Sequence, residues 1–392
     1  MTLVLPGYPP VVYRYPLARV TYGEEEIAAV ERTLRAGRTT MGPQVEAFEA
    51  GFASLVGAQE AVMVNSGSSA DLLAAFALGP PLRGLDEILI PAVTWPTQVW
   101  ACLMAGYRVR LVDVDPATLQ MDPVDLDRKR TWRTRAVFAT HVLGACGSMD
   151  VLAGLCASHE LDLVEDCCEA LGTRWKGRHV GTFGVAGAFS FFFSHVLSTM
   201  EGGMVVTDDP GTARFLRLWR NHGWEPQPGQ HFAFPTWGMN LRPTEAQGAF
   251  GKVQLGRLPG FLAARKRNYW RLDAAIDQQY PGLFARVRVV AGCEFALHAY
   301  PLTVREDAGF TKHELCAYLE QRGVETRPLI AGNLARQPAL QEESRVLSGD
   351  LPGADAVHDR AFYIGLASED DPEGTGYVGE CVRDFIEKGE RA

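Results

Sequence analysis

Polar residues that suit a phosphate follow an apolar stretch early in the chain. Residues 61–64 are apolar and lead into residues 65–69, Asn-Ser-Gly-Ser-Ser, directly before a helical pattern. The free N–H groups of a helix start and the positive end of its dipole would meet there, and small residues let a phosphate approach. An ordinary capped helix would carry the same residues, so this motif alone leaves both interpretations open.

Carboxylates and one aromatic ring follow two further apolar stretches. Residues 161–164 lead to Glu165, Asp166 and Glu169. Carboxylates at the end of a buried strand are costly unless a cation or a hydrogen-bond donor meets them, and a protonated pyridine nitrogen would be such a partner. Trp95 follows a strand expected at 87–91, in the position where α/β sheets bind ligands, and it could stack on a planar cofactor or serve packing alone.

His195 is the residue of the stretch FSFFFSHVLSTMEGG (189–203) whose ordinary pKa lies near neutrality. We expect this stretch to be a buried strand, a short polar turn and a glycine step into the next strand, GMVVTDD (203–209). A histidine at the end of a strand in this region could move protons near neutral pH.

These residues lie in a chain with a regular order of elements. Strand and helix patterns alternate from residue 60 to residue 208, which predicts a mostly parallel sheet covered by helices. From about residue 290 the pattern changes to a mixture of strands (295–304 and 324–330) and a helix (311–322). We therefore predict an α/β protein with a large domain (1–260) and a smaller α+β C-terminal domain (261–392).

Composition narrows the functional classes. The formal net charge of -9 argues against nucleic-acid binding, and no apolar run approaches the roughly 20 residues needed to span a bilayer. The start of the chain lacks the pattern of an export signal. The eight cysteines form no CxxC pair, so we expect buried free thiols, no metal site and a cytoplasmic location.

Several motifs in order resemble the sugar aminotransferase family, whose members are fold-type-I pyridoxal-phosphate enzymes that act on nucleotide-linked keto-sugars. The resemblance covers nearly the whole chain and implies the fold-type-I PLP-dependent transferase fold. The motifs are YPLARVTYGEEEIAAV, TMGPQVEAFE, VNSGSSA, PAVTWPT, VEDCCEALG, KGRHVGTFGVAGAFSF, MEGGMVVTDD and GMNLRPTEAQGA.

The resemblance implies a set of cofactor contacts. The phosphate would be bound by Gly67, Ser68, Ser69 and Ser190, and the ring would lie against Trp95. Asp166 would pair with the pyridine nitrogen and keep the ring an electron acceptor. Glu169 matches a position that contacts the 3-hydroxyl of the ring and that is usually glutamine. Asn240 matches a residue that reaches the cofactor phosphate bound in the neighbouring subunit. We therefore expect a homodimer whose active sites are shared between subunits.

The main departure from the family is His195, which replaces the lysine that binds the cofactor covalently. Only six lysines are present, and none lies between 177 and 251. This exchange resembles the nucleotide-4-keto-6-deoxyhexose 3-dehydratase branch, as do residues 325–340 and the segment DRAFYIGL. No cysteine lies between 169 and 292, which implies the iron-free, GDP-4-keto-6-deoxy-D-mannose 3-dehydratase-like subtype without an iron–sulfur cluster. Val196 departs from this branch, where a second histidine is common.

The branch implies a reaction in two halves. L-glutamate would convert pyridoxal phosphate to pyridoxamine phosphate, and a nucleotide-linked 4-keto-6-deoxy sugar would then lose its C3 hydroxyl. His195 would remove a proton from the cofactor and could return one to the leaving hydroxyl, and the products would be a 3-deoxy-4-keto sugar and ammonia. Arg327, Asn333 and Arg336 are candidates for substrate contacts, and a charged surface loop is the alternative for all three.

Two other functions stay open from the sequence. One is a nucleotide-sugar aminotransferase that uses His195 only as a base. The other is a non-catalytic homologue that binds the cofactor and serves as a partner subunit. The retained Asp166, Trp95 and phosphate loop favour an enzyme over this second alternative.

Overall fold

The computed structural model describes residues 2–3 and 11–389, and its largest element is an eight-stranded sheet with the order β17-β5-β4-β8-β9-β12-β13-β3. Neighbouring strands from β17 to β12 are parallel, whereas β13 is antiparallel to both β12 and β3. β3 therefore points in the same direction as the parallel strands. In chain order the strands are β3 (Glu60–Val64), β4 (Glu87–Pro91), β5 (Arg108–Val112), β8 (Thr134–Thr140), β9 (Asp162–Asp166), β12 (Ala186–Ser190), β13 (Gly203–Thr207) and β17 (Val346–Leu347).

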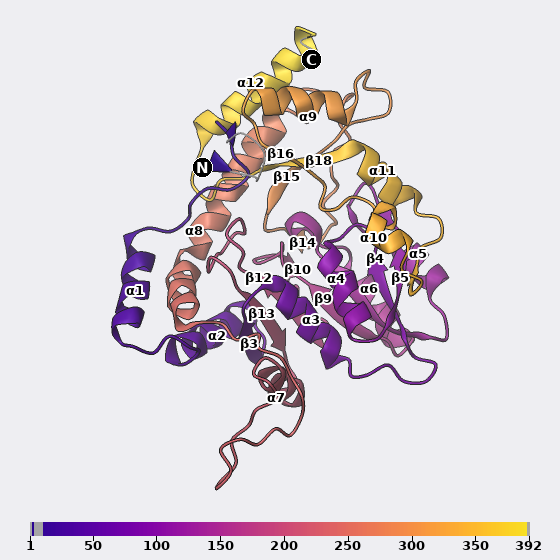
Figure 1. Ribbon diagram of the computed structural model, residues 1–392. Coiled ribbons are helices and arrows are strands. Elements are labelled where there is room, and N and C mark those ends of the chain that lie inside the picture. Colours follow the sequence, from indigo (N-terminus) through magenta and orange to yellow (C-terminus); the bar gives the residue numbers. More distant parts are fainter. Residues whose placement is uncertain (1, 4–10, 390–392) are drawn as a thin grey trace.

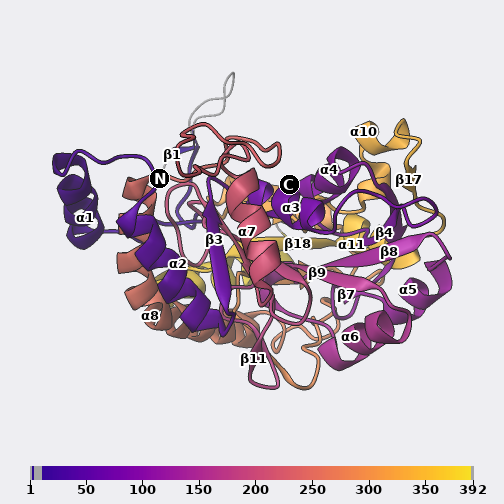
Figure 2. The same cartoon turned by 90° about the horizontal axis from the view of Figure 1, so that it is seen from below.

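Helices cover both faces of the sheet (Figures 1 and 2). Alternate residues of each strand enter two separate apolar cores, as the two-residue period of a strand requires. In β3, for example, Val62 and Val64 pack on one face, and Ala61 and Met63 pack on the other. The helices that contribute to the first core are α3 (Gly67–Ala77), α4 (Pro96–Met104), α7 (Pro210–Trp219) and α11 (Pro352–Arg360), and those of the second are α2 (Pro43–Val56), α5 (Pro123–Lys129), α6 (Met149–Ser158) and α8 (Glu245–Ala275).

A smaller antiparallel sheet with the order β15-β18-β16 lies above the main sheet in Figure 1. Its strands are β15 (Ala299–Thr303), β16 (Thr326–Pro328) and β18 (Ala361–Gly365), and α9 (Lys312–Gln321), α12 (Pro372–Glu387) and the last part of α8 pack against them. Tyr15, from the start of the chain, is buried in the same core. The α+β pattern expected from about residue 290 is thus present.

The domain boundary expected at residue 260 falls inside α8, which continues through this position although it contains Pro259. The chain also returns to the large sheet later, because Leu329, Leu334 and Leu351 belong to one of its cores and β17 pairs with β5. The division into residues 1–260 and 261–392 stays a prediction.

The remaining elements are short, apart from α1 (Glu24–Arg35), which stands apart from the main sheet in Figure 1. None of the helices among the described residues combines the length and the apolar character needed to cross a bilayer. The short elements are β1 (Thr2–Leu3), β2 (Val11–Val12), β6 (Val114–Asp115), β7 (Gln120–Met121), β10 (Arg174–Trp175), β11 (Arg178–His179), β14 (Cys293–Glu294), α10 (Pro338–Gln341) and the 3-10 turns η1 (Val142–Gly144) and η2 (Leu334–Arg336).

We predict a large loss of stability for Phe52→Ala. The Phe52 ring is fully buried and makes edge contacts with Phe189 of β12 and with Phe191 directly after it, at centroid distances of 5.1 and 5.3 Å. Removing such a ring costs about 3–5 kcal/mol of unfolding free energy, which urea unfolding followed by circular dichroism would measure. Val124→Ala, at a position 75% exposed, is the control and should change stability by at most about 0.5 kcal/mol. Equal losses in the two variants would contradict this packing.

Candidate active site

The polar residues singled out from the sequence meet at one edge of the main sheet. Asp166 and Ser190 are the last residues of β9 and β12, and Trp95 caps α4 after β4. Because β3 points in the same direction, its loop to α3 reaches this edge as well. Ligands bind at the carboxyl ends of strands in open α/β sheets, so this edge is the expected location for a site.

The start of α3 is held very close to the end of β12. The hydroxyl of Ser66 caps the helix by accepting from the Ser69 backbone N–H at 3.1 Å. A Cβ atom at Gly67 would lie 2.5 Å from the Ser190 Cβ, and one at Gly203 would lie 2.2 Å from the Ser66 carbonyl oxygen. Glycine is therefore required at both positions, and the first N–H groups of α3 face the same space as Ser190. A helix start of this kind favours an anion such as a phosphate.

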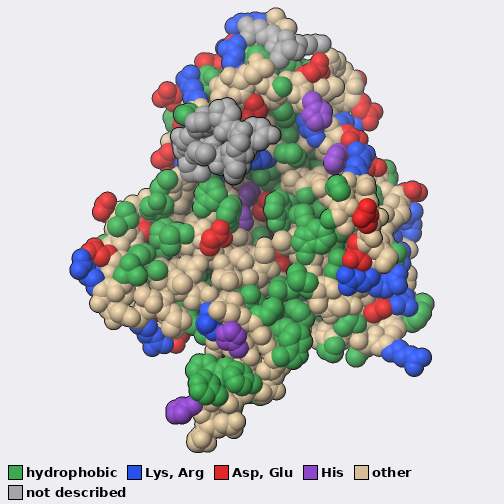
Figure 3. Space-filling model, in the orientation of Figure 1, with side chains coloured by type: hydrophobic (Ala, Val, Ile, Leu, Met, Phe, Trp, Pro, Cys, Tyr) green, Lys and Arg blue, Asp and Glu red, His purple; other side chains and the backbone are tan. Residues whose placement is uncertain are grey.

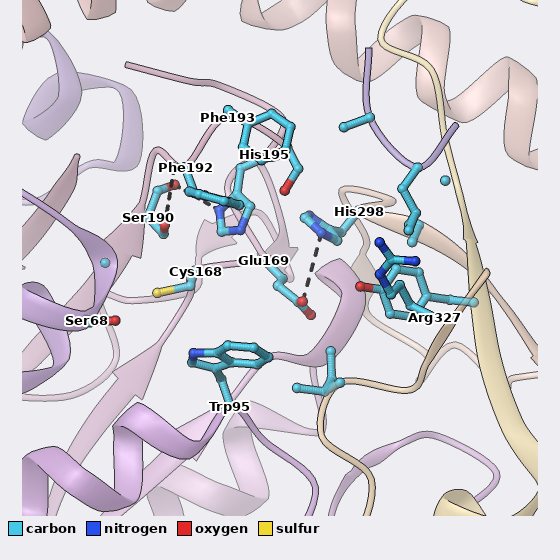
Figure 4. A pocket seen from close by; sticks show the side chains of 18 of the residues that line it. Ser68, Trp95, Cys168, Glu169, Ser190, Phe192, Phe193, His195, His298 and Arg327 are labelled. Atoms are coloured by element: carbon cyan, nitrogen blue, oxygen red, sulfur yellow. Dashed lines mark hydrogen bonds and ion pairs between the residues drawn. The ribbon is translucent and has the colours of Figure 1, made fainter. Parts of the chain in front are cut away.

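A cavity of about 650 Å³ opens at this edge and extends to the smaller sheet (Figure 4). This volume lies within the range of pockets that bind cofactors and small ligands, about 300–1,000 Å³. Eight of the residues predicted from the sequence line it. They are Gly67, Ser68, Trp95, Asp166, Glu169, Ser190, His195 and Arg327.

His195 enters the cavity from the loop after β12, on the side opposite Trp95 (Figure 4). Its Nδ1 lies 3.3 Å from the Ser190 carbonyl oxygen. Because a carbonyl only accepts, a hydrogen bond to Ser190 requires the proton of the neutral ring on Nδ1 and leaves the lone pair on Nε2; the Cys168 backbone also interacts with the ring. Burial lowers the pKa of His195 to about 4, with a smaller opposing effect from the Ser190 carbonyl. The near-neutral pKa expected from the sequence is therefore wrong, and the imidazole at pH 7 is neutral and able to accept a proton.

The carboxylates that the sequence analysis grouped together have different surroundings. Glu165 points to the opposite face of the sheet, where it accepts from the Gly181 and Phe183 N–H groups, both at 2.7 Å, and lies 3.0 Å from His141. These contacts hold the loop of residues 181–183 against the sheet and do not involve the cavity. Asp166 faces the cavity, where it accepts from the Cys168 N–H at 2.9 Å, and burial raises its pKa. Asp166 therefore awaits a cationic partner.

Glu169 lies beside a histidine that the sequence analysis treated only as part of a strand. One Glu169 oxygen accepts from the Leu143 N–H at 2.8 Å, and the other lies 3.9 Å from His298 Nε2 (Figure 4). Burial raises the pKa of Glu169 to about 7. The buried His298 lines the cavity with its ring centroid 5.1 Å from that of His195, and its Nδ1 has no partner among the described residues. The only sequence signal for His298 is a histidine at the start of an apolar strand.

Four predicted residues do not line the cavity. Ser69 is buried, with its hydroxyl donating to Asn65 Oδ1 at 2.6 Å. Asn240 is exposed and pairs with Asn221 near the base of a protruding loop. Asn333 binds Asp355 at 2.8 Å, and Arg336 binds Asp355 and Asp359, both at 2.7 Å. Their roles toward a ligand stay predictions.

Arg327 does reach the cavity, where its guanidinium is partly exposed and donates to Glu325 at 2.6 Å. Lysine, in contrast, is missing from the cavity. All six lysines lie within the described residues, and none lines it. In the segment where the sequence resemblance implies a lysine, the structure presents His195.

The residues fit pyridoxal phosphate. The helix start with Gly67 and Ser190 suits its phosphate, and the Trp95 side chain, 56% exposed, offers a flat surface for its ring. Asp166 is a buried carboxyl group that a protonated ring nitrogen would neutralise. The unpartnered Nδ1 of His298 offers a further polar contact on the same wall.

Comparison with known proteins agrees with this fit. A model of the DegT/DnrJ/EryC1/StrS aminotransferase family matches residues 20–383. The chain belongs to this family. The chain is 33% identical over 375 residues to the GDP-4-keto-6-deoxy-D-mannose 3-dehydratase of Yersinia pseudotuberculosis, an alignment that covers 91% of this chain and 94% of the relative.

Solved structures of family members have the same fold. The Escherichia coli GDP-4-keto-6-deoxy-D-mannose-3-dehydratase with bound hydrated pyridoxal phosphate superposes with a TM-score of 0.89 at 30% identity, covering 94% of this chain and 99% of that one. A sugar aminotransferase from Micromonospora echinospora superposes with a TM-score of 0.85 at 28% identity, covering 94% and 99%. The predicted fold-type-I class and the predicted pyridoxal-phosphate cofactor of this family member are both confirmed.

We predict that Glu169 titrates beside the cofactor ring. In the pyridoxal-phosphate complex, the absorption spectrum should change as the pH passes through 7, because Glu169 gains its negative charge above its pKa of about 7. Glu169→Gln, which has the same shape and no charge, should abolish this change. Glu201→Gln, at a more exposed position of the same cavity, is the control and should keep it. An unchanged titration in Glu169→Gln would contradict the assignment.

Proposed function

We propose that this protein is a nucleotide-sugar 3-dehydratase that removes the C3 hydroxyl of a nucleotide-linked 4-keto-6-deoxyhexose. The observation that carries the proposal is the cavity itself, which presents His195 and no lysine. An aminotransferase of this family depends on its lysine to bind the cofactor again after each turnover. A cavity that offers a neutral imidazole in place of a lysine suits a reaction in which the cofactor is never bound covalently to the chain.

Pyridoxamine phosphate, when bound, supplies an amine for the C4 ketone of the sugar and a ring that accepts electrons. The residues of the chain hold it in place: α3 and Ser190 at the phosphate, Trp95 at the ring face and Asp166 at the ring nitrogen. Because His195 lies on the side opposite Trp95, its Nε2 faces the space where the reacting carbon would lie. His195 Nε2 accepts the proton from that carbon and then returns a proton to the departing C3 hydroxyl.

The remaining polar groups suit the other substrates. Arg327 lines the cavity on the side of the smaller sheet, and a guanidinium is the side chain best suited to a carboxylate or phosphate. We assign it to an anionic group of L-glutamate or of the nucleotide-linked sugar. His298, which is buried between Glu169 and His195, is placed to donate to or accept from the sugar with its unpartnered Nδ1. Hydrolysis then releases ammonia and the 3-deoxy-4-keto sugar.

A nucleotide-sugar aminotransferase is the second candidate, because sugar aminotransferases share this fold at similar identity. The two functions consume the same substrates and give different products. A dehydratase forms ammonia and a 3-deoxy-4-keto sugar, whereas an aminotransferase forms an amino sugar and no ammonia. Both form 2-oxoglutarate, which a non-catalytic homologue would not.

The product distribution tests the proposal. We expect ammonia and a sugar that has lost its C3 hydroxyl when GDP-, dTDP- and CDP-linked 4-keto-6-deoxyhexoses are each incubated with the holoenzyme and L-glutamate, with mass spectrometry as the readout. His195→Asn should lower the rate by about 10²–10⁴-fold, because it removes the base. His313→Asn, on the exposed face of α9, is the control and should leave the rate unchanged. An amino sugar without ammonia would overturn the dehydratase assignment.

We also propose a homodimer whose active sites are shared. The loop between α7 and α8 protrudes from the molecule and carries hydrophobic side chains on its surface (Figures 1 and 3). A monomer rarely exposes so many aromatic rings on one segment, which favours a partner surface. The exposed rings are Trp224 (37%), Phe232 (76%), Phe234 (56%) and Trp237 (65%). Asn240, at the base of this loop, is 45 residues from His195 in sequence and absent from the cavity of its own chain.

Mixing two inactive variants tests whether Asn240 acts across the interface. In a mixed dimer of His195→Asn and Asn240→Asp chains, one site would combine an intact His195 with the partner's intact Asn240. Random mixing makes half of the dimers mixed, so about a quarter of the wild-type activity should return. The control is Asn221→Asp, which changes the residue that pairs with Asn240. This variant should be active by itself, without a partner chain that restores it. If Asn240 acted within its own chain, the mixture of His195→Asn and Asn240→Asp would stay inactive.

A further inference from the structure

A second buried carboxyl group lies beside Asp166. Asp71 is in the first turns of α3, and only 2% of its surface is exposed. It lines the cavity, and its Oδ1 has no hydrogen-bond partner among the described residues. One Asp71 oxygen, one Asp166 oxygen and the Cys168 sulfur all lie within 4.8 Å of one another. A buried polar atom without a partner is unusual, so Asp71 requires a physical explanation.

The groups that face Asp71 are acidic or neutral. The Asp166 carboxyl group, at the end of β9, and the Cys168 thiol, in the turn after it, lie beside Asp71, and Cys102 of α4 is a further neutral thiol on this side of the sheet. Burial and the charge of Asp166 together raise the pKa of Asp71 well above its ordinary value. Two carboxylates within 4.8 Å of each other repel, which favours a proton on one of them when a single cation is available. A protonated ring nitrogen would supply one positive charge.

We propose that Asp71 is a positioning residue that is kept as a neutral carboxylic acid beside Asp166, so that the two together carry one negative charge and match one protonated ring nitrogen. The neutral acid has an O–H group, and Asp166 can accept its hydrogen bond in addition to those from the Cys168 N–H and thiol. This inference rests on the proposed placement of the ring nitrogen at Asp166. It adds two statements to that placement: Asp71 and Asp166 together carry one negative charge, and the O–H group of Asp71 orients Asp166.

The protonation state of Asp71 can be measured without reference to the reaction. We would compare infrared spectra of the holoenzyme and its Asp71→Asn variant, both labelled with ¹³C-carboxyl aspartate, at a pH above 7. Glu169 and Asp277, whose pKa values are also raised, are present in both proteins, so their infrared bands cancel in the difference spectrum. We expect a neutral carboxylic acid C=O band in the wild type that is lost in Asp71→Asn. Loss of carboxylate bands instead would overturn the proposal.

The pH dependence of stability gives a second measurement. Asp71 keeps its proton in the folded state, whereas an unfolded aspartate loses it above a pKa of about 3.9. The folded state then binds one more proton, so wild-type stability falls as the pH rises between the two pKa values. Relative to Asp71→Asn, the wild-type unfolding equilibrium constant should rise about tenfold per pH unit in this range. A ratio that stays constant with pH would contradict a neutral Asp71.

Asp166→Asn separates this inference from the proposed function. If Asp166 faces the ring nitrogen, this variant should bind pyridoxal phosphate more weakly and change its absorption spectrum. If Asp166→Asn leaves binding and spectrum unchanged, the placement of the ring nitrogen fails. The infrared band would then still report whether Asp71 is protonated. The proposal that Asp71 and Asp166 together match the charge of the ring nitrogen would be overturned.

Discussion

The site depends on a group of carboxyl groups at the carboxyl edge of the main sheet, none of which forms an ion pair with lysine or arginine among the described residues. Asp71, Asp166 and Glu169 all reach the cavity, and burial raises the pKa of each. Ionised carboxylates in such a place cost free energy that only a positive charge or good hydrogen bonds can offset. Glu165, one residue before Asp166, shows the satisfied case, because it binds His141 and backbone N–H groups on the opposite face. Asp166 and Glu169 each accept a backbone N–H, and Asp71 Oδ1 has no partner among the described residues, so this edge suits a cofactor with a protonated nitrogen.

The fold brings the partners of that cofactor together from distant parts of the chain. The parallel strands set Trp95, Asp166 and Ser190 at one edge, and the glycines at 67 and 203 allow α3 to approach it. The smaller sheet closes the other side and contributes His298 and Arg327. Because partial burial keeps His195 neutral, the cavity holds a base in its unprotonated form at pH 7. In the proposed dehydratase, the cofactor is held by contacts on all sides and by no covalent bond to the chain.

Sequence patterns predicted much of this arrangement. The strands that end at Val64 and Asp166 were expected from apolar runs followed by polar residues, and these ends meet because parallel strands share an edge. The buried strand expected from Phe189 onward instead ends at Ser190, and Phe192 and Phe193 after it are exposed. The pKa of His195 could not be predicted, because it depends on burial that only the folded chain creates. Glu165 was misplaced among the cavity residues because its side of the strand depends on register. His298 and Asp71 gave no functional signal, because one begins an apolar strand and the other lies in an apolar helix.

Borohydride reduction followed by intact-mass spectrometry tests most directly whether the cofactor is held without a covalent bond. Borohydride makes any bond between a lysine and pyridoxal phosphate permanent. The wild-type chain, loaded with pyridoxal phosphate and reduced, should keep its unmodified mass, whereas a His195→Lys variant treated in the same way should gain the mass of one reduced cofactor. A wild-type chain that gains this mass, with the modification mapped to one of its six lysines, would contradict the role given to His195.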